Sequence, residues 1–570
     1  MASPDSKQID NLDHISQLPE SMILNILSRL PLEDSARASI LSKTWKRFCS
    51  LYPILYFDHN LFALQSLVAA KEGGGGPDIN QIRDMFMDRV DYQLSGAMLL
   101  DSPIRKLALT VALNDSVYIS RVDKLMELVR QINVEDLCIT VLSADFMSCR
   151  DDIIRSSVVY ELPLSVLSSK GLRSACIRGC NFGCETLIED PINKYFSLQR
   201  LCLSHVFMDE HVLENLIRHC QGIEILVLDN CSVEIEFLTL SKFPKLKRAV
   251  IRIRAGKLDY VDIVDTNLEC FKCYSNGTEV LVSPVACAGI RELTVAWGSR
   301  IQPDLLKDLT AIFPFLEEGE LHLHGIDTLK AANNGLRKFY CYSPLMKEVH
   351  IDCPSLTLLH CSANDLSELY VDCPKLREFG YWATAIPDRV FCSSMANLEE
   401  SQCCIIMFEA CDTLWLVKLR AFLILVMGNA TNVKLTFKLP MARFEPEQVE
   451  AIELSPLYNV HLTLVIGGIM QDIAPLMDGL LWIIRPTTLT VSCRTPYVVK
   501  YLCENLYKKQ EDSICNEQLI RPCWMHKLKD FHVDCPLGVP VTKKNLAAFP
   551  EQCRTLLGQK ICFKFHWCFN

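Results

Sequence analysis

The sequence predicts an α/β fold in which three N-terminal helices precede a long array of repeats, each with one short strand. Three observations predict it. Apolar residues at helical spacing fill the first fifty positions, a short apolar pattern then returns at nearly constant intervals, and helical spacing separates some of its copies. We expect a solenoid with a parallel β-sheet on its concave side and with helices and loops on its convex side.

Length and composition set the broad class of protein. The 570 residues allow about four ordinary domains, or one long array with smaller parts. Hydrophobic residues make up 49% and charged residues 22%, so most of the chain can bury a core. The 58 Lys and Arg residues are outnumbered by 68 Asp and Glu residues, which gives a net charge of −10. This balance argues against a nucleic-acid partner, because binding to phosphates relies on clustered cations.

The 28 cysteines favour a reducing compartment over a disulfide scaffold. Residues 1–14 contain neither the basic nor the apolar segment of a signal peptide. The most apolar window, residues 414–427, is interrupted by Lys418 and Arg420 and is too short to span a bilayer. We therefore expect no membrane partner, a location in the cytoplasm, the nucleus or both, and mostly free, buried thiols. Disulfides are the less favoured alternative.

The three N-terminal helices are predicted from apolar spacing and from start and stop signals. Pro19 suits a first helical turn, and Pro31 ends that helix. A second helix fits residues 33–39, and a third fits residues 43–51 with Ser42 as its N-cap. The first helix carries one apolar face, formed by Ile23, Ile26, Leu27 and Leu30. Three such short helices cannot bury their apolar faces against one another alone. They therefore either bind a partner or cap the next domain.

Residues Asp13 to Asp58 resemble a plant-type F-box. They read D-x-I-S-x-L-P from Asp13, I-L-S-x-L-P up to Pro31, and R-x-S-x-L-S-x-x-W from Arg37 to Trp45. The resemblance implies docking onto a Skp-type adaptor, which links the chain to a cullin. By position, the implied adaptor contacts are Leu18, Pro19, Ile23, Ile26, Leu27, Leu30, Pro31, Leu41 and Trp45. Leu18, Pro19 and Trp45 are the expected hot spots. Other members must hold the helices together, and the sequence does not say which.

The repeat array is predicted over residues 101–500. The pattern apolar-x-x-apolar-x-apolar begins at positions 172, 198, 223, 246, 268 and 290, in steps of 26, 25, 23, 22 and 22. Leu213, Leu216 and Ile217 form a helical face between two copies. One strand and one helix in each unit of this length are the signature of a leucine-rich solenoid. The array resembles the irregular leucine-rich repeats of plant F-box proteins.

The spacing tightens and then lengthens in the second half of the array. Leu356, Leu366 and Leu376 lie ten residues apart. Either the convex connections shorten here, or only alternate copies are complete coils, or two solenoid segments meet near residue 350. The array lengthens again through residues 433–435, 460–462 and 489–491, and the apolar residues from Ile473 to Ile484 indicate a helix before the last of these.

The chain is expected to divide into five parts: a disordered tail (1–12), the F-box (13–58), a helical linker (59–100), the solenoid (101–500) and a C-terminal cap (501–570). The linker contains the glycines 73–76. Residues 523–533 resemble the start of an FBD-type module, whereas Pro550 and Cys553 interrupt the helix that such a module would have next. An atypical last unit of this kind would cover the open end of the solenoid.

No catalytic or cofactor-binding motif is present in the sequence, and neither G-x-S-x-G, H-E-x-x-H nor a phosphate loop occurs. Cys270 and Cys273 lack the second pair of ligands that a zinc site needs. The resemblance therefore implies a non-catalytic substrate-recognition subunit of an SCF-type (Skp–cullin–F-box) ubiquitin ligase, which needs no cofactor. Alternatives are a non-ligase scaffold and a small-ligand sensor. Candidate contacts to the target protein, expected together on the concave face, are His322, His350, Asp352, Tyr370 and Asp372.

Overall fold

The structure is a computed structural model, and it divides into two compact units, residues 1–232 and 233–570. The described residues are 18–29, 37–38, 40, 42–51, 54–71, 78–99, 104–113, 116–143, 160–168, 171–182, 197–264, 266–282, 287–296, 298–301, 309–323, 325–393, 397–406, 410–427, 430–438, 441–442, 455–467, 472–492, 496–510, 524–535, 541, 546, 548–550 and 559–568. The predicted tail, the glycines 73–76, and Leu30, Pro31, Leu41 and Cys553 lie outside them.

The first unit begins with helices. Of the three that were predicted, the first and third are confirmed as α1 (Glu20–Arg29) and α3 (Lys43–Leu51), whereas most of residues 33–39 lie outside the described residues. Ser42 caps α3, because its Oγ accepts a hydrogen bond from the Trp45 amide at 3.2 Å. The predicted linker contributes α4 (His59–Lys71) and α5 (Ile79–Leu99).

A parallel sheet follows these helices in the first unit. Its strands pair in the order β1 (Ile54–Asp58), β2 (Ile104–Leu113), β3 (Val134–Ser143), β5 (Ser174–Arg178), β7 (Arg200–Ser204) and β9 (Ile225–Thr239). Two helices connect neighbouring strands, α6 (Ser116–Gln131) and α7 (Glu210–His219). The second confirms the helix predicted between two repeats. Shorter elements accompany the sheet: β4 (Glu161–Leu162), η2 (Leu164–Ser168), β6 (Asn181–Phe182) and β8 (Phe207–Asp209).

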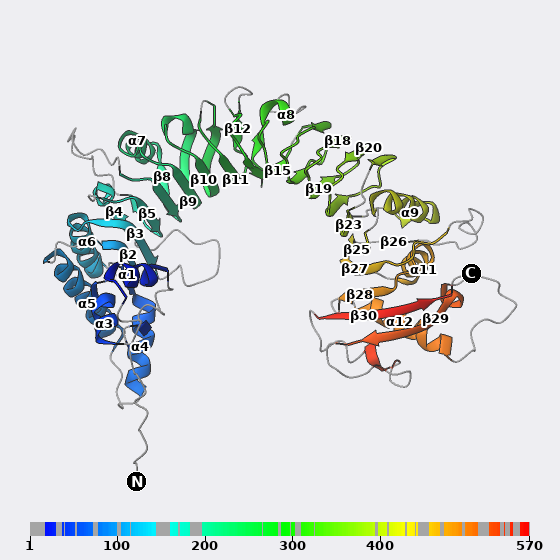
Figure 1. Ribbon diagram of the computed structural model, residues 1–570, viewed down its shortest axis with the longest axis horizontal. Helices are drawn as coiled ribbons and strands as arrows, with labels where there is room; N and C mark the ends of the chain where they lie inside the picture. Colours follow the sequence, from blue (N-terminus) through cyan, green and yellow to red (C-terminus); the bar gives the residue numbers. More distant parts are fainter. Residues whose placement is uncertain are drawn as a thin grey trace, which may run out of the picture. The chain divides into compact units, whose positions relative to one another are not determined.

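The second unit continues the repeat pattern as one ladder of parallel strands, called here the large sheet (Figure 1). Its strands are β10 (Arg248–Asp262), β11 (Cys270–Ser275), β13 (Glu292–Ala296), β15 (Glu318–His322), β17 (Lys338–Tyr342), β19 (Leu358–Ala363), β21 (Glu378–Ala383), β23 (Glu400–Ile406), β25 (Asn432–Lys438), β27 (His461–Gly467) and β28 (Thr488–Ser492). Early in the unit lie η3 (Leu240–Lys242), β12 (Glu279–Leu281), β14 (Arg300–Ile301) and α8 (Leu309–Ile312).

A second, small sheet explains the ten-residue spacing. It consists of β16 (Thr328–Ala331), β18 (Glu348–Asp352), β20 (Glu368–Asp372) and β22 (Arg389–Ser393), which alternate along the chain with strands of the large sheet. Only alternate copies of the pattern therefore complete a coil. Because β15, β17, β19 and β21 pair in sequence, two segments do not meet near residue 350. The prediction of helices and loops opposite the large sheet is wrong here, since so short a connection has room for a strand but not a helix.

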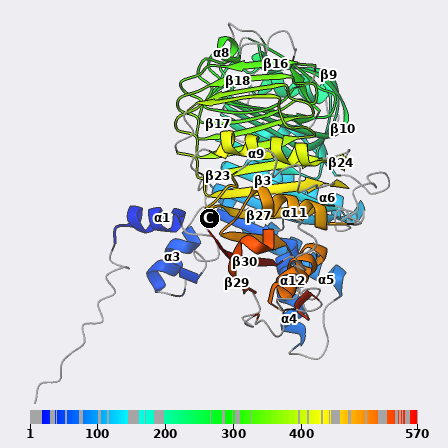
Figure 2. The same ribbon diagram turned by 90° about the vertical axis from the view of Figure 1, so that its right-hand side faces the viewer.

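Helices return where the coils lengthen. The apolar window forms α9 (Thr413–Met427), and the predicted later helix is α11 (Ala474–Ile483), which lies beside α9 in both views (Figure 1 and Figure 2). Among the helices that the structure describes, none is long and apolar enough to cross a membrane. Two short strands, β24 (Ala410–Cys411) and β26 (Met441–Ala442), pair beside them.

The C-terminal region adds antiparallel strands to this parallel sheet. After α12 (Pro496–Gln510) and η5 (Trp524–Lys527), β29 (Leu528–Asp534) and β30 (Lys560–Trp567) pair with each other, and β30 pairs with β28. The half-buried carboxylate of Asp478 on α11 accepts hydrogen bonds from Trp524 Nε1 at 2.9 Å and from the hydroxyl of Tyr501. These bonds fasten the C-terminal region to the last coils.

The interior of the coils is filled by side chains at matching strand positions. Phe339, Leu359 and Phe379 are register partners on three successive strands of the large sheet, and all three are fully buried. Cys341 and Cys361, two residues further along the same strands, are also register partners, and both are buried free thiols. In these narrow coils cysteine serves as a small apolar residue.

Candidate functional site

The two described F-box helices enclose a small core. Ile23, Leu27, Ala38 and Trp45 form a buried cluster, and Leu18 packs against it. Ile23 and Leu27 are fully buried and Trp45 is 3% exposed. Three of the predicted adaptor contacts therefore hold the F-box itself together. Burial assigns these three to the packing of the F-box, which the sequence left open, whereas contact with an adaptor stays a prediction.

Other apolar side chains of the same helices face outward. Pro19 and Ile26, both predicted adaptor contacts, are exposed, and so are Met22 and Ile40, which the sequence reading missed. Ile40 is 84% and Met22 55% exposed, large fractions for apolar side chains. We call Pro19, Met22, Ile26 and Ile40 the exposed F-box surface. Leu30, Pro31 and Leu41 lie outside the described residues, so their predicted role stays a prediction.

The outward side of the large sheet carries a cluster of rings between β15 and β21, which we call the aromatic face. Its members are His322, Tyr340, Tyr342, His360 and Trp382. Register places Tyr340 opposite His360, and it places Tyr342 opposite His322 on one side and Ser362 on the other. The rings therefore lie in two rows across the strands, one with Tyr340 and His360 and the other with His322, Tyr342 and Trp382.

The rings of the aromatic face contact one another across the strands. His322 and Tyr342 have ring centroids 5.1 Å apart, and Tyr340 and His360 lie 4.8 Å apart in an edge-to-face arrangement. His360 also lies 4.5 Å from Trp382. Gly380 makes room for this last contact, because an added Cβ would lie 2.5 Å from Cη2 of Trp382 and 2.6 Å from Cδ2 of His360.

Carboxylates surround the aromatic face. His360 Nε2 lies 2.9 Å from Glu378 Oε1, and the amide of Gln402 donates to Glu400 at 3.1 Å. Burial raises the pKa of Glu320, and burial lowers the pKa of His360 against the opposing effect of Glu378. In the described part of the chain, Glu320, Glu378 and Glu400 have no lysine or arginine within ion-pair distance. The face therefore combines aromatic rings with carboxylates that form no ion pair with lysine or arginine, although the charge of Lys272 acts on Glu320.

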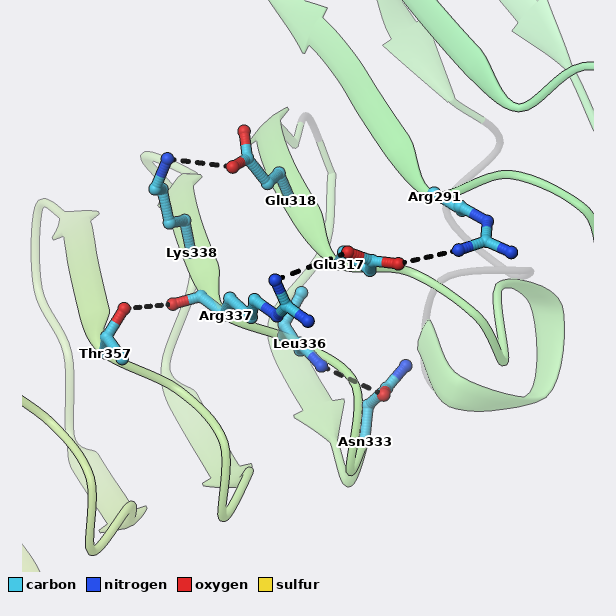
Figure 3. A network of polar contacts seen from close by, with 8 residues as sticks. All are labelled: Arg291, Glu317, Glu318, Asn333, Leu336, Arg337, Lys338 and Thr357. Carbon is cyan, nitrogen blue, oxygen red and sulfur yellow. Dashed lines mark hydrogen bonds and ion pairs between the residues drawn. The ribbon is translucent and has the colours of Figure 1, made fainter. Parts of the chain in front are cut away.

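One edge of the sheet shows the opposite situation, in which charges are compensated (Figure 3). Just before the strands, the carboxylate of Glu317 lies 3.0 Å from Arg291 and 3.9 Å from Arg337. One residue further along, Lys338 pairs with Glu318 at 2.8 Å. These exposed pairs link neighbouring coils, and their positive charges are already matched by carboxylates.

The predicted contacts to the target protein do not share one face. His322 belongs to β15 of the large sheet, whereas His350 and Asp352 on β18, and Tyr370 and Asp372 on β20, belong to the small sheet. The expectation that all five lie together was wrong, because ten residues carry the chain from one sheet to the other. On the small sheet, His350 and Tyr370 stack with centroids 5.6 Å apart.

Sequence reasoning missed Tyr340, Tyr342, His360 and Trp382. A signal for them exists in the spacing: Tyr340 and His360 lie twenty residues apart, as do the positions of Tyr342, Ser362 and Trp382. Reading it requires knowing that twenty residues, and not ten, complete a coil. The apolar pattern alone fits a coil of ten residues as well as one of twenty residues.

Neither a metal site nor a ligand-sized pocket stands out in the described residues. No group of three or more His, Cys, Asp and Glu side chains there is placed to hold a metal ion. A cavity in the first unit, lined by His59, Arg83, Phe86 and neighbouring residues, has a volume of about 10 Å³. This is room for about one water molecule and not for a larger ligand.

Comparison with known proteins gives two family matches. A model of the F-box domain matches residues 15–56, and a model of the leucine-rich repeats of FBD-associated F-box protein At5g56370 matches residues 122–280. Neither model describes a catalytic domain.

Curated relatives come from Arabidopsis thaliana. F-box protein At3g59000 is 29% identical over 219 residues, which cover 38% of this chain and 40% of that protein. Putative F-box/LRR-repeat protein At3g58880 is 27% identical over 334 residues, 58% of this chain and 65% of that protein. F-box/LRR-repeat protein At3g26922 is 49% identical over 49 residues, 9% of this chain and 16% of that protein.

The aligned part of the chain spans less than two thirds of the length of each of these relatives. The matches nevertheless agree in kind and in order along the chain, with the F-box first and the repeats behind it. They confirm the resemblance seen in the sequence: the chain carries an F-box domain and leucine-rich repeats of the FBD-associated type, and its homologues are Arabidopsis F-box/LRR-repeat proteins.

Proposed function

We propose that this protein is a substrate-recognition subunit of an SCF-type ubiquitin ligase in the cytoplasm, the nucleus or both. The F-box docks on a Skp-type adaptor, and through it on a cullin, while the repeats bind the protein to be ubiquitinated. The observation that carries the proposal is that a matched F-box leaves Met22, Ile26 and Ile40 exposed on its surface. Several large apolar side chains exposed on so small a unit are typical of a protein interface.

Docking would use the exposed F-box surface, with the buried cluster as its support. Burying an exposed isoleucine or methionine at an interface stabilises the complex by about 1.5–3 kcal/mol. Trp45 and Ile23 act indirectly, since they fix the angle between α1 and α3 and so the spacing of the outward side chains. Leu30, Pro31 and Leu41 stay in the proposed contact set on the resemblance alone.

For the substrate side, we place recognition on the aromatic face. Tyr340 and Tyr342 are more than one third exposed, and together with Trp382 they offer rigid ring surfaces of the kind that dominates protein interfaces. The carboxylates of Glu320, Glu378 and Glu400, which form no ion pair with lysine or arginine in the described residues, favour a partner segment rich in these cations. Its cations would lie over the rings and beside the carboxylates, each worth about 0.5–2 kcal/mol.

The ligase role requires no chemistry from this chain. Holding the substrate beside the conjugating enzyme raises the effective concentration of the target lysine, which accelerates a reaction that other subunits perform. The residues of this chain contribute through binding and orientation.

The test is co-purification of the full chain with a Skp-type adaptor and a cullin. We expect stoichiometric binding by the wild type and a loss of at least about thirtyfold in affinity for Ile26→Glu, because a charge enters the proposed interface. Leu64→Glu is the matched control: Leu64 is a 60% exposed apolar residue on α4, outside the F-box, and its variant should bind normally. Absence of adaptor binding by the folded wild type would refute the proposal.

A further inference from the structure

A row of three thiols crosses the sheet of the first unit. Register places Cys138 on β3 opposite Cys176 on β5, and it places Cys176 opposite Cys202 on β7. All three are partly exposed, whereas Cys180, four residues after Cys176, is buried. Register partners on parallel strands point to the same side of the sheet, so the three thiols stand side by side on its outward face.

The spacing of Cys138 and Cys176 suits a disulfide. Neighbouring strands lie about 4.8 Å apart, and the Cα atoms of disulfide-bonded cysteines are usually about 4.4–6.8 Å apart. The two thiols also influence each other's ionisation, since the pair interaction lowers the pKa of Cys176 and raises that of Cys138. Only a small approach of the two side chains is then needed for a bond.

Cations surround the central thiol. Arg178 follows it by two residues on the same face of β5, Arg200 precedes Cys202 by two residues on β7, and Lys106 lies on β2. The hydrogen bond from Cys138 and the charges of Arg178, Arg200 and Lys106 lower the pKa of Cys176 against the opposing effect of burial. Asp136, the register partner of Lys106, and Asp229, the register partner of Ser204 on β9, are acidic groups on the same face.

The third thiol has different surroundings. Burial and the nearby charge of Cys176 raise the pKa of Cys202, and the pKa of Cys138 is raised chiefly by its hydrogen bond to Cys176. Arg178 reaches across toward β7, where its Nε lies 3.4 Å from Ser204 Oγ. Cys176, which stands between the two other thiols and beside the cations, is therefore the nucleophile of the row, and Cys138 is its register partner on β3.

We propose that Cys176 and Cys138 form a peroxide-sensitive dithiol that closes reversibly to a disulfide. The Cys176 thiolate attacks one oxygen of hydrogen peroxide; an S–O bond forms as the O–O bond breaks, and the leaving hydroxide takes a proton to become water. The Cys138 thiol then attacks the sulfenic sulfur, the S–S bond forms, and the oxygen leaves as a second water. Two thiols lose two electrons in total, and one peroxide gains them. The reaction requires neither adaptor nor substrate protein.

The first readout is the rate of alkylation in the reduced, full-length wild type. At pH 7 an ordinary thiol is only about 3% ionised, so full ionisation raises the rate about thirtyfold, and lower intrinsic nucleophilicity offsets part of this gain. We expect limiting iodoacetamide to label Cys176 at least about fivefold faster than Cys202, an equally placed internal control. Equal labelling of the two would overturn the proposal, and this measurement needs no variant.

The second readout is peptide mapping by mass spectrometry after treatment with hydrogen peroxide. We expect a peptide pair linked through Cys138 and Cys176 that dithiothreitol separates. Cys138→Ser should abolish the link and leave a sulfenic acid on Cys176 that dimedone traps, whereas Cys202→Ser, the matched control, should leave the link intact. Linkage of Cys176 to Cys202 as often as to Cys138, or no linkage at all in the wild type, would also overturn the proposal.

Discussion

Gly380→Ala should move the indole of Trp382 without disturbing the strand that carries both residues. The added methyl carbon would lie 2.5 Å from Cη2 of Trp382 and 2.6 Å from Cδ2 of His360, whereas contacting carbons sit about 3.5–4.0 Å apart. The indole must therefore shift by about 1 Å or more. Gly380 is not one of the glycines with positive φ, so the backbone of β21 accepts alanine.

The expected cost separates stability from binding. Losing the contact between His360 and Trp382 removes about 0.5–1.5 kcal/mol of unfolding free energy. If Trp382 anchors the substrate, the same variant weakens substrate binding by about 2 kcal/mol or more, roughly thirtyfold. A modest loss of stability with a large loss of binding is the expected combination.

The assay is fluorine NMR of protein labelled with 5-fluorotryptophan. The chain has seven tryptophans, and Trp382→Phe identifies the resonance of Trp382 by its disappearance. In Gly380→Ala that resonance should shift while the others stay. Gly289→Ala is the control, because its methyl would meet the Leu268 carbonyl oxygen at an ordinary 3.4 Å. An unmoved Trp382 resonance in Gly380→Ala would refute the reasoning.

Two further predictions concern other parts of the chain, and a third concerns the carboxylates of the aromatic face. Asp478→Ala should lower the unfolding free energy by about 1–3 kcal/mol in urea titrations, because Trp524 Nε1 loses its acceptor, whereas Asp478→Asn keeps one and should lose less. Burial, and secondarily a nearby arginine, lowers the pKa of His59 from its usual 6.5; the unfolded chain therefore takes up the proton first, and stability present above pH 6.5 is lost as the pH falls toward the folded-state pKa. Thermal melts at pH 7 and pH 5 should show a smaller decrease for His59→Phe than for the wild type, and equal decreases would contradict this. Glu378→Gln with Glu400→Gln should weaken binding of an arginine-rich synthetic peptide in fluorescence anisotropy, most at low salt, and equal wild-type affinity for an acidic peptide would count against the charge argument.

Local elements could be predicted because each is encoded by neighbouring residues. The strand pattern around Leu201 and Leu203, both fully buried, and the helical face of Leu213 and Leu216 identified β7 and α7 correctly. The alternation between two sheets could not be predicted in this way. Each strand of either sheet buries two alternate apolar residues, so the sequence of a single strand does not show to which sheet it belongs.

The candidate sites depend on packing between elements, which the sequence pattern does not contain. Ile23 and Ile26 are alike in type and share one predicted helical face, yet the first is fully buried and the second 38% exposed. The difference arises from where α3 and Ala38 lie against α1. Likewise, His322 and His350 look equivalent along the chain, and only the pairing of strands places them on different sheets.

The alternation of the two sheets constrains how this part of the array can change in length. Between β15 and β21, a ten-residue segment moves the chain from one sheet to the other, and a twenty-residue segment returns it to the same sheet. Loss or gain of ten residues before these strands would move every later strand to the other sheet. Trp382 would then lie on the small sheet and Tyr370 on the large sheet. Insertions, deletions and designed extensions that add or remove whole coils of this kind should therefore come in multiples of about twenty residues, whereas a change of about ten residues should not be tolerated.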